Sequence, residues 1–253
     1  MTARRFLRAV AGKAAACAVV CTLASSIAIS DADPVRDAWK LEGYEVDGQA
    51  READGILLFQ DGRFGMVYTM RSAGGPLSAR AHAGVYRVAG DRLHFDVRWW
   101  VEDVDGAARV VPGVTREPRL ALDGDRLALH FANGSVQRLR RVPAGAAPQA
   151  EGAWQVRTVR APNAAAAPAT GLLVAAGGQF ALIYTEGEGE RATRGHAVAG
   201  SVTGNILQVI RSVSSLDGVG TVASGGGPAL TLRGSGTTRT VTDPSGRTLS
   251  LVR

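Results

Sequence analysis

The sequence predicts an all-β protein made of two tandem antiparallel meander β-barrels that follow an N-terminal signal peptide. Three observations predict this fold class. Apolar and polar residues alternate with a period of two, as in strands that are buried on one face. Turns rich in Gly, Asp and Asn recur every eight to twelve residues, as in antiparallel hairpins. The chain after residue 30 also repeats itself at an offset of about 115 residues.

The first thirty residues follow the plan of a signal peptide, with a basic start, an apolar middle and small residues at the end. The basic residues are Arg4, Arg5, Arg8 and Lys13. Cleavage after Ala28 or after Ser30 fits the pattern, and an Arg pair ahead of Phe-Leu leaves both the general and the twin-arginine export routes open. No stretch reaches the roughly 20 strongly apolar residues of a spanning helix. We therefore expect a periplasmic or secreted protein with no stable membrane span after cleavage.

The formal charge of +6 and the pI near 10.0 arise mostly in this segment. It holds four of the 29 basic residues and none of the 23 acidic ones, so 25 basic residues remain against 23 acidic ones. They form no basic stripe, and we therefore expect no nucleic-acid partner. Cys17 and Cys21 also lie in the segment, so the mature chain has no disulfide, thiol nucleophile or cysteine metal site.

Two homologous modules, 36–143 and 151–253, are expected after the signal peptide (1–30), joined by a linker at 144–150 that is rich in Pro, Ala and Gly. The letters Ala-Trp-Lys-Leu at 38–41 recur as Ala-Trp-Gln-Val at 153–156. The strand-like segment 63–69 recurs as 179–185. Because the offset stays nearly constant, the similarity is that of a duplicated domain and not of chance Ala-rich text.

The first module contains eight runs of strand character. In order, they span 38–46, 55–60, 63–71, 82–89, 92–102, 108–122, 125–132 and 135–142. Pro112 and Pro118 interrupt the sixth run, because proline cannot donate to a strand ladder. Eight meandering strands suit a closed barrel, which removes exposed sheet edges. On 92–102 the alternation places Trp99 inward and Trp100 outward, and the second module keeps the alternation at 180–184 and 207–209.

Several short motifs resemble the lipocalin-like, or calycin, domains, in particular the short bacterial ones. Gly-Ala-Trp at 152–154 matches the Gly-x-Trp that opens the family's first strand, whereas 37–39 keeps only the Trp. The hairpin from Gly55 to Phe64 and the segment from Gly84 to Leu93 also resemble the family. The resemblance implies a barrel whose apolar interior holds a small hydrophobic ligand in many relatives. It also implies a basic residue that packs over the opening Trp, for which Arg141 and Arg253 are the aligned candidates.

The expected pocket-lining residues share the inward faces of the strands. They are Trp39, Phe64, Met66, Tyr68, His82, Tyr86, Phe95, Trp99, Trp154, Phe180 and Tyr184. The alternative is that they simply form the core. His82 aligns with His196, but no second His or carboxylate lies at ligand spacing on its strand. We therefore assign no metal site, no catalytic residue and no cofactor.

Trp100 is expected to have a role other than lining the pocket. Adjacent residues of a strand face opposite sides, so Trp100 faces outward if Trp99 faces inward. An outward Trp is costly unless something covers it, so we expect Trp100 to pack between the modules or on a partner protein. The leading functional hypothesis is an exported protein that binds a small hydrophobic ligand in a barrel interior. The alternatives are a ligand-free envelope scaffold and a cofactor-free isomerase or hydratase-type enzyme, and the sequence gives the enzyme the least support.

Overall fold

The alternating pattern forms strands along nearly the whole of the chain that the computed structural model describes. The described residues are 33–71, 75, 77–104, 107–143, 145, 150–187, 194–216, 219–224 and 227–253. The predicted signal peptide and its cleavage site lie outside these residues, as does most of the predicted linker. Within the described ranges, no helix is long and apolar enough to cross a membrane.

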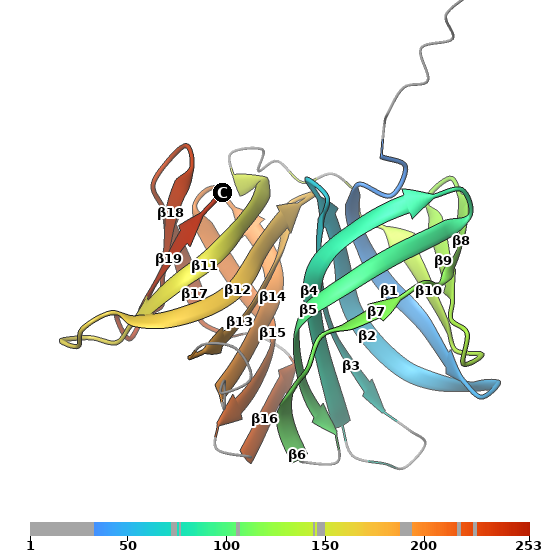
Figure 1. The fold of residues 1–253 in the computed structure, drawn as a ribbon, viewed down its shortest axis with the longest axis horizontal. Helices are drawn as coiled ribbons and strands as arrows, with labels where there is room; N and C mark the ends of the chain where they lie inside the picture. The colour runs from blue at the N-terminus through green and yellow to red at the C-terminus, as the bar shows by residue number, and fades with distance from the viewer. Residues whose placement is uncertain are drawn as a thin grey trace, which may run out of the picture. The chain divides into compact units, whose positions relative to one another are not determined.

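The first barrel is formed by the first ten strands (Figure 1). They are β1 (Asp37–Val46), β2 (Gln49–Gln60), β3 (Arg63–Arg71), β4 (Leu77–Ala89), β5 (Arg92–Val104), β6 (Ala107–Val111), β7 (Val114–Arg116), β8 (Arg119–Asp123), β9 (Arg126–His130) and β10 (Val136–Arg141). Strands β6, β7 and β8 pair in succession along β5 and act as one strand that Pro112 and Pro118 interrupt. Pairing of β10 with β1 closes an eight-stranded antiparallel barrel.

The second barrel repeats this plan. Its strands are β11 (Gly152–Arg160), β12 (Ala167–Ala176), β13 (Gln179–Glu186), β14 (Arg194–Thr203), β15 (Ile206–Leu216), β16 (Val219–Ser224), β17 (Ala229–Arg233), β18 (Thr238–Thr242) and β19 (Thr248–Val252). Here β16 and β17 share the long β15, and β19 closes the barrel on β11. The predicted fold class, all-β with two eight-stranded antiparallel barrels in sequence, is confirmed.

A β-bulge in β5 reverses the predicted alternation beyond Arg98. Across the β4–β5 ladder, Ala83 pairs with Trp99 but Gly84 pairs with Val97, so Arg98 is the extra residue. As a result Trp100 points into the barrel, where it belongs to the inner core, and Trp99 points outward. The predicted facing of these two tryptophans was therefore wrong, because a period-two pattern cannot reveal an inserted residue.

A glycine opposite each bulge makes this geometry possible. A Cβ at Gly84 would lie 1.9 Å from the carbonyl oxygen of Asp96. The second barrel has the same slip in register between Ala199 and Gly200, and a Cβ at Gly200 would lie 1.9 Å from the carbonyl oxygen of Gln208. The bulge is thus a shared feature of both barrels.

Outward-facing small and aliphatic residues of the two barrels form one common buried cluster. Its members are Ala38, Ile56, Leu58, Val67, Ala79, Ala81, Ala83, Val101, Ala153, Leu172, Val174, Ala181, Ile183, Ala197 and Ala199. Trp99 packs against it, and its Nε1 donates a hydrogen bond to Thr170 Oγ1 at 3.3 Å. The contact between modules that the sequence assigned to Trp100 is therefore made by Trp99.

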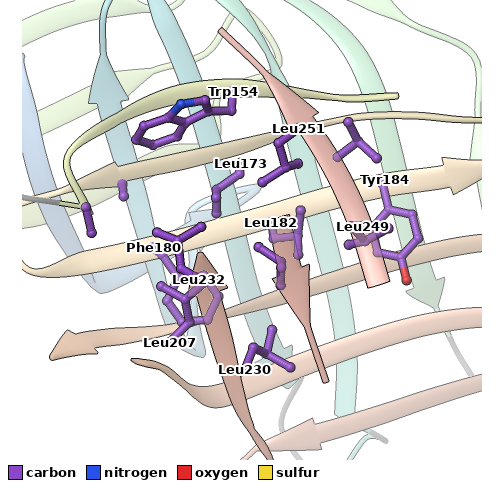
Figure 2. Close-up of a cluster of buried hydrophobic side chains, with 14 of the residues drawn as sticks. Trp154, Leu173, Phe180, Leu182, Tyr184, Leu207, Leu230, Leu232, Leu249 and Leu251 are labelled. Atoms are coloured by element: carbon purple, nitrogen blue, oxygen red, sulfur yellow. The ribbon is translucent and has the colours of Figure 1, made fainter. Parts of the chain in front are cut away.

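Each barrel has its own inner core, and a basic residue lies over the Trp of its first strand. The guanidinium carbon of Arg141 is 4.3 Å from the ring centroid of Trp39, and that of Arg253 is 5.8 Å from the ring of Trp154. The contact implied by the family resemblance is present at Trp39, whereas at Trp154 Arg253 shares the ring with Arg239, whose guanidinium carbon is closer, at 5.3 Å from the centroid. Figure 2 shows the second core, with Trp154 and Tyr184 at opposite ends of a cluster of leucines around Phe180.

Candidate binding cavities inside the two barrels

The interior of the first barrel is not completely filled, and a cavity of about 100 Å³ remains. Its apolar lining consists of Leu57, Phe64, Met66, Phe95, Val97, Trp100 and Phe131. Its polar lining consists of Tyr44, Tyr68, Arg80, His82, Arg116, Asn133, Ser135 and Gln137. The polar residues gather toward the end of the barrel where β3 ends and β4 begins. The cavity therefore combines an aromatic, aliphatic interior with a polar rim.

The predicted lining residues divide into three groups in the structure. Phe64, Met66, Tyr68, His82 and Phe95 do line the first cavity, and Tyr184 lines a second cavity described below. Trp39, Tyr86, Trp154 and Phe180 are buried in the inner cores but line neither of these cavities. Trp99 lies outside its barrel, so the prediction that it lines the pocket was wrong. The sequence prediction missed other residues that line the first cavity, among them Trp100, Arg80, Arg116 and Gln137.

Trp39 and Tyr86 hold the far end of the first barrel. The Nε1 of Trp39 donates a hydrogen bond to the carbonyl oxygen of Val35 at 2.8 Å, and the hydroxyl of Tyr86 donates to Asp33. Burial, followed by the hydrogen bond and charge of Asp33, raises the pKa of Tyr86. The polar atoms of Trp39 and Tyr86 are therefore bonded within the protein, and the cavity lies toward the opposite end of the barrel.

An ion pair between the partly exposed Arg80 and the buried Glu102 supports one side of the first cavity. The Nε of Arg80 lies 3.4 Å from Oε2 of Glu102, which is only 1% exposed. The same carboxylate accepts a hydrogen bond from Nε1 of Trp100 at 3.1 Å. Arg80 also donates to the hydroxyl of Tyr68, whose pKa is raised mainly by burial, so the hydroxyl stays protonated. The contacts of Glu102 fix both Arg80 and the indole of Trp100 at the cavity wall.

Arg116 supplies a second cation at the rim. Its guanidinium carbon lies 5.2 Å from the centroid of the Trp100 ring, and its side chain is exposed. Among the described residues, no acidic side chain pairs with Arg116. Burial, followed by the charges of Arg116 and Arg80, lowers the pKa of His82 to about 3, so this imidazole is neutral. Since Glu102 balances only one of the two arginines, the first cavity carries a net positive charge.

The second barrel contains a larger and more apolar cavity of about 180 Å³. Its lining consists of Leu182, Tyr184, His196, Val198, Val209, Pro228, Leu230, Val241, Asp243, Arg247 and Leu249. At its rim, Oε1 of Glu186 lies 2.8 Å from Nε2 of His196 and is also paired with Arg247. The His196 ring stacks on Tyr184 at 4.9 Å between centroids.

His82 and His196 do not occupy equivalent places, although the sequence aligned them. His196 lies opposite Tyr184 in the ladder, as Arg80 lies opposite Tyr68. His196 is therefore the counterpart of Arg80. In the described part of the chain, no group of three or more His, Cys, Asp or Glu residues could hold a metal ion.

Comparisons of the chain with protein-family models, with curated proteins and with solved structures find no match. The two cavities are therefore the features of the chain that point to a function.

Proposed function

We propose that the chain is an exported, lipocalin-like protein whose first barrel binds a small apolar molecule bearing an acidic group. The fold supports the family assignment, since each barrel is an eight-stranded antiparallel meander with a basic residue over the first-strand Trp. The single observation that carries the function is an aromatic cavity whose charged rim has an unbalanced cation.

The size of the first cavity limits its ligand to a few carbon atoms. At about 100 Å³ it is smaller than the roughly 150 Å³ engineered cavity that accepts benzene, and smaller than the roughly 300 Å³ at which pockets for drug-sized ligands begin. A short branched chain fits this volume. Its methyl groups would contact Met66, Val97 and the Trp100 ring.

The charge of the rim selects the other end of the ligand. Arg80 is already paired with Glu102, whereas no carboxylate of the described residues pairs with Arg116, whose guanidinium lies over the ring of Trp100. A guanidinium binds a carboxylate by charge-assisted hydrogen bonds, which are about twice as strong as neutral ones. A carboxylate at the rim would restore electroneutrality, and the buried Gln137 offers an amide to its second oxygen.

Calorimetric titration with 3-methylbutanoate and with its amide tests this proposal. We expect saturable binding of the carboxylate, about tenfold tighter than the amide. Arg116→Gln should remove this preference. Arg140→Gln is the matched control, because Arg140 is an exposed arginine that pairs with Glu42. Equal affinity for the acid and the amide would refute the charge argument. Saturable binding of neither would refute the proposal and favour the ligand-free scaffold.

Export is the remaining part of the proposal and rests on the sequence of residues 1–30. Cell fractionation and N-terminal sequencing of the mature protein test it. We expect the protein outside the cytoplasm, with a mature chain that begins at Ile29 or Asp31. A cytoplasmic chain that retains Met1 would contradict this part of the proposal.

A further inference from the structure

The rim of the second cavity differs from that of the first, because its cation is already balanced. Arg247 pairs with Glu186, and the same carboxylate contacts His196. Asp243 is also occupied, since its Oδ1 accepts hydrogen bonds from the Arg247 amide at 2.9 Å and from the Ser245 hydroxyl at 2.7 Å. An anion entering this cavity would lose its hydration without meeting an unpaired cation, and a cation would meet only Asp243, whose Oδ1 already accepts two hydrogen bonds.

Tyr184 provides a hydroxyl that the protein itself does not use. The side chain is 7% exposed and lines the cavity, and Figure 2 shows its oxygen beyond the leucines at the end of the core opposite Trp154. Within the ranges that the structure describes, no group hydrogen-bonds to this hydroxyl. Burial raises the pKa of Tyr184, so the group remains a hydrogen-bond donor at neutral pH. In the first barrel, the equivalent hydroxyl of Tyr68 is already occupied by Arg80.

Away from His196, Asp243 and Arg247, the lining of the cavity is aliphatic, and the cavity is large enough for a six-membered ring. Leu182, Leu230 and Leu249 line it, and its volume of about 180 Å³ exceeds the roughly 150 Å³ of the engineered cavity that binds benzene. An aliphatic wall of this kind is a site for an apolar body, and the Tyr184 hydroxyl is a polar anchor beside it.

From these observations we propose that the second barrel binds a small, neutral, apolar molecule with one hydrogen-bond-accepting oxygen, such as a ketone, with this oxygen at the Tyr184 hydroxyl. The two barrels therefore select different ligands, an acid in the first and a neutral carbonyl compound in the second. This second site does not depend on the first, since the two cavities share no lining residue.

Methyl NMR of the intact protein tests the proposal. The two cavities are lined by different methyl-bearing residues, so the signals that shift show which barrel holds the ligand. The probes are cyclohexanone, cyclohexane, cyclohexanecarboxylate and protonated cyclohexylamine. We expect cyclohexanone to shift the methyl signals of Leu182, Leu230 and Leu249, with the two charged analogues at least tenfold weaker. Shifts confined to Leu57 and Val97 would place the ring in the first barrel and overturn the proposal. Equal or tighter binding of either charged analogue would also overturn it.

Tyr184→Phe isolates the hydrogen bond. The substitution should weaken cyclohexanone roughly three- to tenfold, the range expected for one neutral hydrogen bond, and leave cyclohexane unchanged. Tyr68→Phe is the matched control in the first barrel and should change neither affinity at the second site. If Tyr184→Phe does not fold, the affinities of the unaltered protein for cyclohexanone and for cyclohexane still test the hydrogen bond. The proposal expects cyclohexanone to bind more tightly, and equal affinities would overturn it. An unchanged cyclohexanone affinity in a folded Tyr184→Phe protein would overturn it as well.

Discussion

Gly84→Ala is expected to destabilise the first barrel strongly, although it adds only one methyl group. The added Cβ would lie 1.9 Å from the carbonyl oxygen of Asp96, about 1 Å inside the 3.0 Å limit that real Cβ contacts respect. The obstacle is backbone, so no side chain can rotate away, and the ladder opposite the bulge must shift. Overpacking of this kind costs about 2 to 3 kcal/mol.

Gly43→Ala is the matched control, because a Cβ at Gly43 meets only the Cβ of Arg138, at 3.8 Å. It should change the unfolding free energy by less than about 1 kcal/mol. Replacing Gly by Ala also reduces the backbone entropy of the unfolded chain, which favours the folded protein. Urea unfolding followed by Trp fluorescence measures both variants. If Gly84→Ala were as stable as Gly43→Ala, the argument that the bulge depends on this glycine, and with it the placement of Trp100, would be refuted.

Two further predictions follow from buried groups. Because His82 has a folded-state pKa of about 3 against 6.5 for the ordinary imidazole, the unfolded chain binds more protons between these values, so stability falls as the pH drops from about 6.5 toward 3. His82→Gln should flatten that part of the stability profile measured by urea unfolding at successive pH values, and an unchanged slope would contradict the assignment. Ala181→Asp would bury an unpaired charge in the cluster shared by the barrels and cost several kcal/mol, whereas Ala121→Asp on the exposed face of β8 should cost less than about 0.5 kcal/mol. Thermal unfolding compares the two, and similar melting temperatures would show that the shared cluster does not form.

Much of the fold could be predicted because the strands are regular. The period-two alternation, the Gly and Asx turns and the repeat together indicated two eight-stranded barrels, and the two prolines located the interrupted strand at β6 to β8. These signals are local or repeat along the chain, so one sequence suffices to recognise them.

The bulge and the charged rims could not be predicted in the same way. The extra residue at Arg98 leaves no mark in the alternation, and only the paired glycines at 84 and 200 hint at it, because each faces a backbone carbonyl. Arg80 and Arg116 resemble ordinary solvent-facing residues in a strand pattern, since the sequence does not show where a barrel interior becomes a rim. His82 and His196 were misaligned because the β14–β15 hairpin is four residues shorter than the β4–β5 hairpin, since Gly200 and Val209 are paired where Gly84 and Val97 are paired in the first barrel.

A crystal structure of the mature protein with 3-methylbutanoate bound is the most direct test of the central claim, that the first barrel is a binding site for a small acid. The claim predicts density for the ligand inside the first barrel, with its carboxylate within hydrogen-bond distance of the Arg116 guanidinium and its methyl groups against Met66, Val97 and Trp100. A first cavity closed by rearranged side chains, or a ligand bound only outside the barrel at saturating concentration, would contradict it.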